Sequence, residues 1–314
     1  MTRPRLSGRD RIGAGNRAAF GAAWAAALVL APLAAQASSP SDLYFERSVM
    51  SAADSRCALF TPEIGAALNA AKAQARGAAL RAGVDSQSLR QTAARAEARA
   101  GGVACRSPDL TTAAARVRNA FEGYSRLVRM NYPGDIAVWR ADRTLPIDGV
   151  AWRLSQTAAL SGGGTMTFGM AGQRGQPTRL LAVMDFGGGP TPYAARLVLR
   201  DQARAPEPYL GVIQVSSTAR LPLQSRVTPR FAAKVYAAET RGPADPWLVE
   251  RGVKSATAFS FPIAAADAIA GLDPREAITV ELVYAGRSGD TVRQAYVEVG
   301  DFAAGQAFMT LSRR

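Results

Sequence analysis

Histidine is absent from all 314 residues of the sequence. Its absence excludes Ser-His-Asp and Cys-His catalysis and removes the commonest ligand of transition metals. The sequence also lacks a G-x-S-x-G nucleophile elbow, an S-x-x-K element, a phosphate-binding G-x-x-x-x-G-K-[ST] loop and a D-x-D-x-D-G calcium loop. Its glycine triplets, 162–164 and 187–189, are typical of turns. These patterns predict no catalytic motif, no metal and no cofactor.

Cysteine and lysine are both scarce. Cys57 and Cys105 are the only cysteines, and Lys72, Lys234 and Lys254 are the only lysines among 38 basic residues. The two cysteines form no C-x-x-C motif, so a redox-active or metal-binding pair is not indicated. The arginines are scattered and form no long run, so no nucleic-acid-binding tail is predicted. The formal net charge of +13 indicates a solvated basic surface or, alternatively, attraction to an anionic membrane surface or acidic glycan.

The first 37 residues have the pattern of a secretory signal peptide. Arginines from Arg3 to Arg17 are followed by an apolar stretch, residues 18–35, and by the A-x-A sequence that ends at Ala37. We expect cleavage between Ala37 and Ser38 and a periplasmic or secreted protein. The alternative is a membrane anchor, which weakly hydrophobic alanine does not favour. No second apolar stretch of spanning length follows, so the cleaved protein is predicted not to be transmembrane.

Residues 38–140 have helical periodicity and form a predicted α-helical domain. Helix starts are indicated at Asp42, at Thr61-Pro62-Glu63, at Asp85 and at Ser107-Pro108-Asp109, because such residues cap helix N-termini. The last of these helices has the clearest apolar stripe in the chain and is expected to end near 131–134. The stripe comprises Leu110, Ala113, Val117, Phe121, Tyr124 and Val128.

Cys57 and Cys105 each precede one of these predicted helices, with two helices between them. Antiparallel packing of those two helices would bring the cysteines together, and an exported protein meets an oxidising compartment. We therefore predict a disulfide that closes a helical hairpin. The chain-entropy model gives a crosslink over this separation about 4 kcal/mol of stabilisation.

Residues 141–314 change to a period of two. Roughly nine short strands are predicted between turns rich in glycine and proline, with one short helix at 264–270. The pattern favours an antiparallel β-sandwich or a partly open barrel. Together with the helical region, it predicts an α+β fold. The predicted strands begin near 150, 166, 180, 195, 211, 231, 256, 278 and 292.

The last sixty residues resemble the C-terminal half of the invasion-associated locus B family of exported bacterial proteins. The resemblance lies in Phe261-Pro262-Ile263, Leu272, the strand Ile278–Tyr284 and the segment Val299–Ala304. It implies an extracytoplasmic β domain and names no catalytic residues. The cysteines typical of the family are missing from this half of the chain.

Two groups of residues are candidates for a functional site. Carboxylate pairs can act as acid and base in glycoside hydrolysis, and an aromatic group near 132–152 could pack as core, form an interface or stack on a ligand. A solvated or turn carboxylate is the simpler interpretation of each acid. The acids are Asp185, Glu207, Asp267, Glu281 and Asp301; the aromatic residues are Tyr132, Trp139 and Trp152.

These features predict an exported, non-enzymatic protein of the bacterial envelope that serves as a protein-interaction or structural module with an unknown partner. The alternatives are a carboxylate-dependent enzyme acting on glycans or peptidoglycan, and a binder of anionic glycan or lipid.

Overall fold

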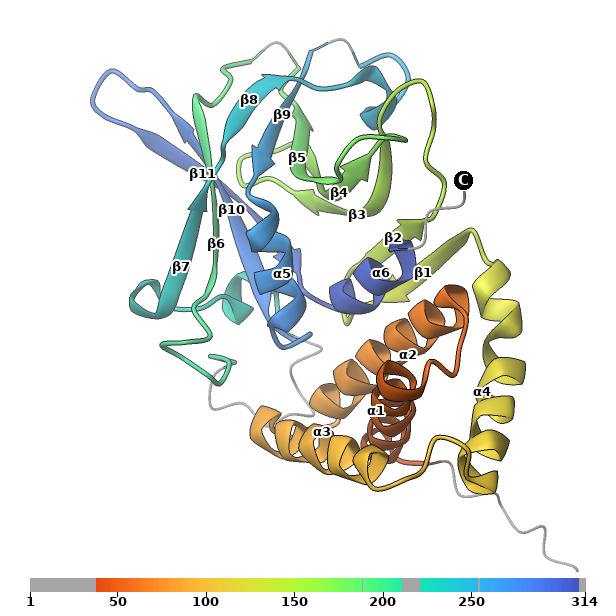
Figure 1. Cartoon of the computed structure of the whole chain (residues 1–314). Helices are drawn as coiled ribbons and strands as arrows, with labels where there is room; N and C mark the ends of the chain where they lie inside the picture. The colour runs from red at the N-terminus through yellow and green to blue at the C-terminus, as the bar shows by residue number, and fades with distance from the viewer. Residues whose placement is uncertain (1–37, 188, 211–220, 254, 311–314) are drawn as a thin grey trace, which may run out of the picture. The chain divides into compact units, whose positions relative to one another are not determined.

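The computed structural model describes residues 38–187, 189–210, 221–253 and 255–310. Figure 1 shows helices at the start of this range and two β-sheets after them. The predicted signal peptide and Ala37 lie outside the described residues, as does the strand expected at 211–215. Within the described ranges, no helix is both long enough and apolar enough to cross a membrane.

Capping residues set the starts of the first four helices. Thr61, Asp85 and Ser107 accept hydrogen bonds from the backbone three residues later, which confirms the helix starts predicted there. The first helix begins earlier than expected, because Ser39 is its N-cap and Asp42 completes a capping box with it. The helices are α1 (Pro40–Cys57), α2 (Pro62–Arg81), α3 (Ser86–Gly101) and α4 (Pro108–Arg126).

The predicted disulfide is present. Cys57 ends α1, Cys105 lies between α3 and α4, and their Cα atoms are 5.5 Å apart. α1 packs against both α2 and α3, and α2 also packs against α4 (Figure 1). The bond therefore joins the end of α1 to the segment that leads into α4.

The chain leaves helical conformation earlier than the sequence predicts. α4 ends at Arg126, and Leu127 is already extended. The Arg143 guanidinium accounts for this end, because its Nη1 lies 3.0 Å from the carbonyl oxygens of Ser125 and Leu127 and supplies donors that a continued helix would provide. The residues at 131–134, expected to end the helix, lie mostly in a strand, β1 (Arg129–Pro133).

The strands pair antiparallel, as predicted, and in the described residues they form two sheets. The order is β1-β2-β3-β4-β5-β9-β8 in the seven-stranded sheet and β11-β10-β6-β7 in the four-stranded sheet. An isolated bridge between Leu160 and Ala295 links the two sheets. The remaining strands are β2 (Val138–Asp142), β3 (Ala151–Ala159), β4 (Thr165–Gly172), β5 (Arg179–Asp185), β6 (Ala194–Arg200), β7 (Ala233–Ala237), β8 (Thr240–Pro243), β9 (Ala256–Phe261), β10 (Ala277–Tyr284) and β11 (Thr291–Glu298).

One apolar cluster unites the two sheets with two short helices. Phe168 of β4, Val280 of β10 and Phe302 of the last helix are all fully buried in it. The helices are α5 (Ile263–Gly271), which confirms the predicted short helix, and α6 (Phe302–Met309), which the sequence did not indicate. α6 also packs against α2, so the helical and β regions share a boundary. The division into domains at residue 140 remains a prediction.

Candidate functional site

The five candidate carboxylates lie on different elements with different partners. Asp185, at the end of β5, accepts hydrogen bonds from the backbone N–H of Gly187 (3.0 Å) and the hydroxyl of Ser255 (3.1 Å). Glu207 accepts a hydrogen bond from Ser86 at 2.7 Å. These two acids therefore hold turns and helix ends in place.

Each of the other three candidate carboxylates forms an ion pair or a hydrogen bond with a polar side chain. Glu281 of β10 pairs with Arg230, and Asp267 of α5 accepts a 3.4 Å hydrogen bond from Gln306. The third, Asp301, forms a 2.9 Å ion pair with Arg81 of α2.

Within the described residues, no three Asp, Glu or Cys side chains are grouped to hold a metal ion. The contacts of the five candidates do not bring any two of them into one acid–base pair.

Burial sets the electrostatics of Asp301. Burial raises the pKa of its carboxyl, the nearby Asp135 raises it further, and Arg81 opposes both effects. The carboxyl lies beside Gly77, where a Cβ atom would be only 2.7 Å from Oδ1. A side chain at position 77 would therefore displace the Asp301 carboxyl from its present position beside α2.

The predicted aromatic group separates into two places. Tyr132 and Trp139 pair across β1 and β2 and are fully buried. Trp139 donates from its indole nitrogen to the Val299 carbonyl at 2.9 Å and packs edge-on against Phe302. Trp152 packs in another cluster and donates to the Leu248 carbonyl. The first two residues are thus part of the core next to the helical region.

A buried carboxylate missed by the sequence analysis holds the β1–β2 turn. Glu298 of β11 is fully buried and accepts hydrogen bonds from the backbone N–H groups of Asp135, Ile136 and Ala137 at 2.7 to 3.0 Å. The guanidinium of Arg226 lies 3.5 Å away. The charge is thus satisfied by backbone donors and one cation, as a buried carboxylate requires. These contacts make Glu298 a structural anchor.

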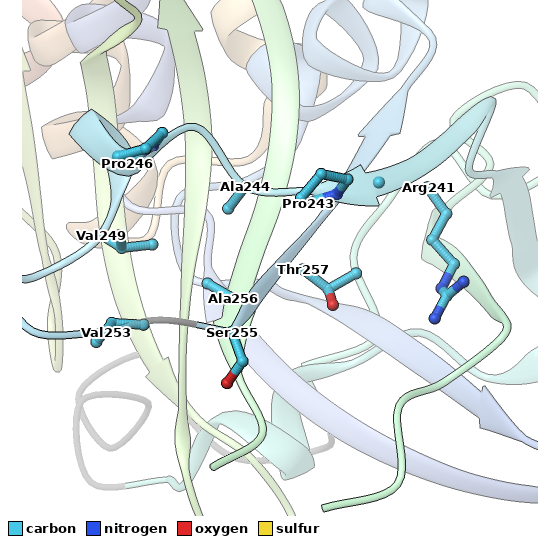
Figure 2. A pocket seen from close by; sticks show the side chains of 10 residues that line it. Arg241, Pro243, Ala244, Pro246, Val249, Val253, Ser255, Ala256 and Thr257 are labelled. Carbon is cyan, nitrogen blue, oxygen red and sulfur yellow. The ribbon is translucent and has the colours of Figure 1, made fainter. Parts of the chain in front are cut away.

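A cavity of about 390 Å³ lies beside β8, and Figure 2 shows the side chains that line it. Its described lining includes one charged side chain, Arg241, together with the hydroxyl groups of Ser255 and Thr257. Arg241 donates to the Thr191 hydroxyl at 3.1 Å. β8 lies at the edge of its sheet and ends at Pro243, and proline disfavours the addition of another strand there. The described lining of the cavity therefore offers no acid–base pair of carboxylates, and the neighbouring edge of the sheet does not favour pairing with another strand.

A cavity of about 520 Å³ forms an open groove between α1 and α4. α1 supplies Phe45, Val49 and Met50 to one side, and Leu68 of α2 is almost fully buried beneath it. The α4 side is formed by Ala113, Val117, Ala120 and Phe121. We call these residues, with the charged residues at the rim, the α1–α4 groove.

The groove exists because α4 is only partly covered. Leu110 and Ala114 are buried in the helical core. Ala113, Val117 and Phe121, which the sequence predicts as one apolar stripe with Leu110, are only half-buried. The predicted stripe lies on α4 from Leu110 to Tyr124, whereas Val128 lies beyond the end of the helix. Periodicity does not show how much of an apolar face a neighbour will cover. The uncovered part faces the groove.

Arginines dominate the charge at the groove. Arg99 of α3 and Arg116 of α4 are exposed, whereas Arg47 of α1 is half-buried. Arg47 donates to the Ala71 carbonyl at 2.7 Å, and burial lowers the pKa of its guanidinium while Glu46 raises it. The rim thus has three cations and one acid, Glu46. An apolar floor with a basic rim can bind an amphipathic, acidic ligand.

Sequence reasoning did not identify these residues as a site, because they are brought together from four helices. Comparison of the chain with protein-family models, curated proteins and solved structures gives no match.

Proposed function

We propose that this protein is exported to the bacterial envelope and binds a protein partner through the α1–α4 groove. The observation that carries the proposal is the half-covered apolar stripe of α4. An apolar surface of this kind, rimmed by polar residues, is typical of an interaction site. Export is supported by the signal-peptide pattern of residues 1–37. The disulfide is consistent with an oxidising compartment.

The remaining parts of the proposal concern the β region. We infer that its two antiparallel sheets form a sandwich or partly open barrel, supported by the apolar cluster that the sheets share. The resemblance of its last sixty residues to the invasion-associated locus B family remains part of the proposal. In this interpretation the β region supports the groove, because its helix α6 packs against α2.

A crosslinking experiment tests the function. The exported protein is incubated with envelope extract, and crosslinked partners of the wild type are compared with those of two α4 variants. Val117→Glu places a charge in the groove, whereas Asn119→Glu places the same charge at an exposed α4 position that does not line it.

We expect a partner that is captured by the wild type and by Asn119→Glu and is lost with Val117→Glu. Far-UV circular dichroism checks that both variants are folded. Capture that is unchanged by Val117→Glu would place the interaction elsewhere and contradict the proposal.

A further inference from the structure

The structure points to one class of occupant: we infer that the α1–α4 groove binds an amphipathic α-helix whose apolar stripe is flanked by acidic residues. The inference rests on the proposed function and specifies the partner of the same site.

The arrangement of helices leaves room for another helix. α1 and α4 both pack against α2, so they form two sides of a groove above Leu68. Met50 and Leu68, almost fully buried, belong to the same apolar cluster as the half-buried Val117 and Phe121. A helix placed between α1 and α4 would continue this cluster, as a further member does in a helical bundle.

The length of the groove also suits a helix. On α4 the lining runs from Ala113 to Phe121, which corresponds to about 12 Å at a rise of about 1.5 Å per residue. That distance matches about two turns of a docked helix, whose contact residues recur at i, i+3 or i+4, and i+7. The expected partner therefore inserts a short stripe of two or three large apolar side chains.

The open side of the groove distinguishes a helix from an acyl chain. The cavity opens to solvent between exposed residues of α1 and α4, among them Glu46 and Ala120. A helix presents its polar face to that solvent, whereas an acyl chain would leave methylene groups in water. The geometry therefore favours an amphipathic helix over a lipid tail.

Charge defines the flanks of the partner. Arg99 and Arg116 are exposed on two different helices, α3 and α4, and Arg47 adds a third positive charge to a lining whose one acid is Glu46. Charges at the rim of an interface act mainly on specificity and association rate. Acidic side chains beside the apolar stripe would be attracted to this rim, and basic ones would be repelled.

The test uses two synthetic peptides of about 18 residues, long enough to populate a helix before binding. Both peptides have the same leucine stripe, and they differ only in having glutamate or lysine beside it. Fluorescence anisotropy measures their binding to the wild type, to Arg116→Glu and to Val117→Glu. Arg287→Glu is the control, because it makes the same charge change in the exposed turn after β10.

We expect the glutamate peptide to bind about 5-fold or more tightly than the lysine peptide, which corresponds to two rim contacts of ordinary strength. Arg116→Glu should reduce that preference, and Arg287→Glu should preserve it. Val117→Glu should weaken both peptides.

Three results would overturn the inference. Equal binding of the two peptides, sensitive to Val117→Glu, would disprove the acidic preference while leaving the groove as a binding site. Binding of anionic phospholipid vesicles, sensitive to Arg116→Glu, without binding of either peptide would show that the occupant is a lipid. Absence of binding by both peptides and by the vesicles would reject a helical occupant, and the crosslinking experiment would then judge the proposed function by itself.

Discussion

The helical region and the β region fill their interiors with different side chains. The helical region has two small clusters in which Ala53, Ala75 and Ala79 are fully buried beside a few leucines. The β region has a large cluster built on Phe168, Phe259 and other aromatic and branched residues, and a smaller one around Leu181. Alanine contributes little buried area, so the helical region depends more on its disulfide and on α2 packing against α6. The apolar groove lies in the region with the thinner core.

The largest effect on stability should come from the β core. Phe168→Ala removes a fully buried ring and should lower the free energy of unfolding by about 3 to 5 kcal/mol. Urea denaturation measures the change. The control is Phe231→Ala at a side chain that is 73% exposed, where we expect a change within about 0.5 kcal/mol. Equal losses at the two sites would show that the β cluster is not the main source of stability.

Loss of the disulfide should be the next largest effect and should be confined to the helices. The double variant Cys57→Ser/Cys105→Ser should lose up to about 4 kcal/mol, the chain-entropy value for this crosslink. Hydrogen exchange should become faster in α1 and α4 and remain unchanged in β10. A melting temperature that does not respond to reducing agent would contradict the dependence of the helices on the bond.

The contact between the two regions should respond to pH through Asp301. Burial raises the pKa of this carboxyl in the folded state above its ordinary value of 3.8. The folded protein therefore holds the proton more tightly than the unfolded chain, and the contribution of Asp301 to stability falls as pH rises from about 3.8 through the folded pKa. Asp301→Asn removes that titration.

Urea denaturation of both proteins across this pH range isolates the effect. The stability of the wild type relative to Asp301→Asn should decrease with rising pH and level off above the folded pKa. A difference that increases with pH would mean that the ion pair with Arg81 outweighs the burial of the carboxyl.

The smallest effect on stability should be found at the groove. Arg116 is exposed, so Arg116→Glu should change the free energy of unfolding by no more than about 0.5 kcal/mol. Thermal denaturation measures this change beside the peptide-binding assay. A large loss of stability would mean that Arg116 supports the fold, and a change in binding could then no longer be assigned to recognition.

The parts of the fold that depend on local chemistry could be predicted from the sequence. Thr61, Asp85 and Ser107 start helices through hydrogen bonds to residues only three positions away. The predicted end of α4 was wrong because a residue far along the chain sets it. Val128 continues the helical spacing of the stripe, but Arg143, which is 16 residues after Leu127, instead binds the carbonyl groups of Ser125 and Leu127.

Contacts between distant parts of the chain set the rest of the structure. α6 was missed because Phe302–Met309 is short, and its place depends on packing against α2. Arg81 and Asp301 form an ion pair although they are 220 residues apart. In the groove, the apolar character of Val117 and Phe121 was predicted, but their half-burial follows from the positions of α1 and α2. No pattern within α4 alone specifies that partial cover.

The burial of Glu298 constrains the order in which the protein can fold. The β1–β2 turn is held by this residue at the end of β11, and α2 is covered by α6. A ribosome releases the N-terminus first, so both contacts must wait until nearly the whole polypeptide has emerged. Until then the early helices and the first hairpin lack their permanent partners, and their apolar surfaces are open to chaperones and proteases. A chain that ends before α6 should therefore lack the cover of α2, although every residue of the groove is present.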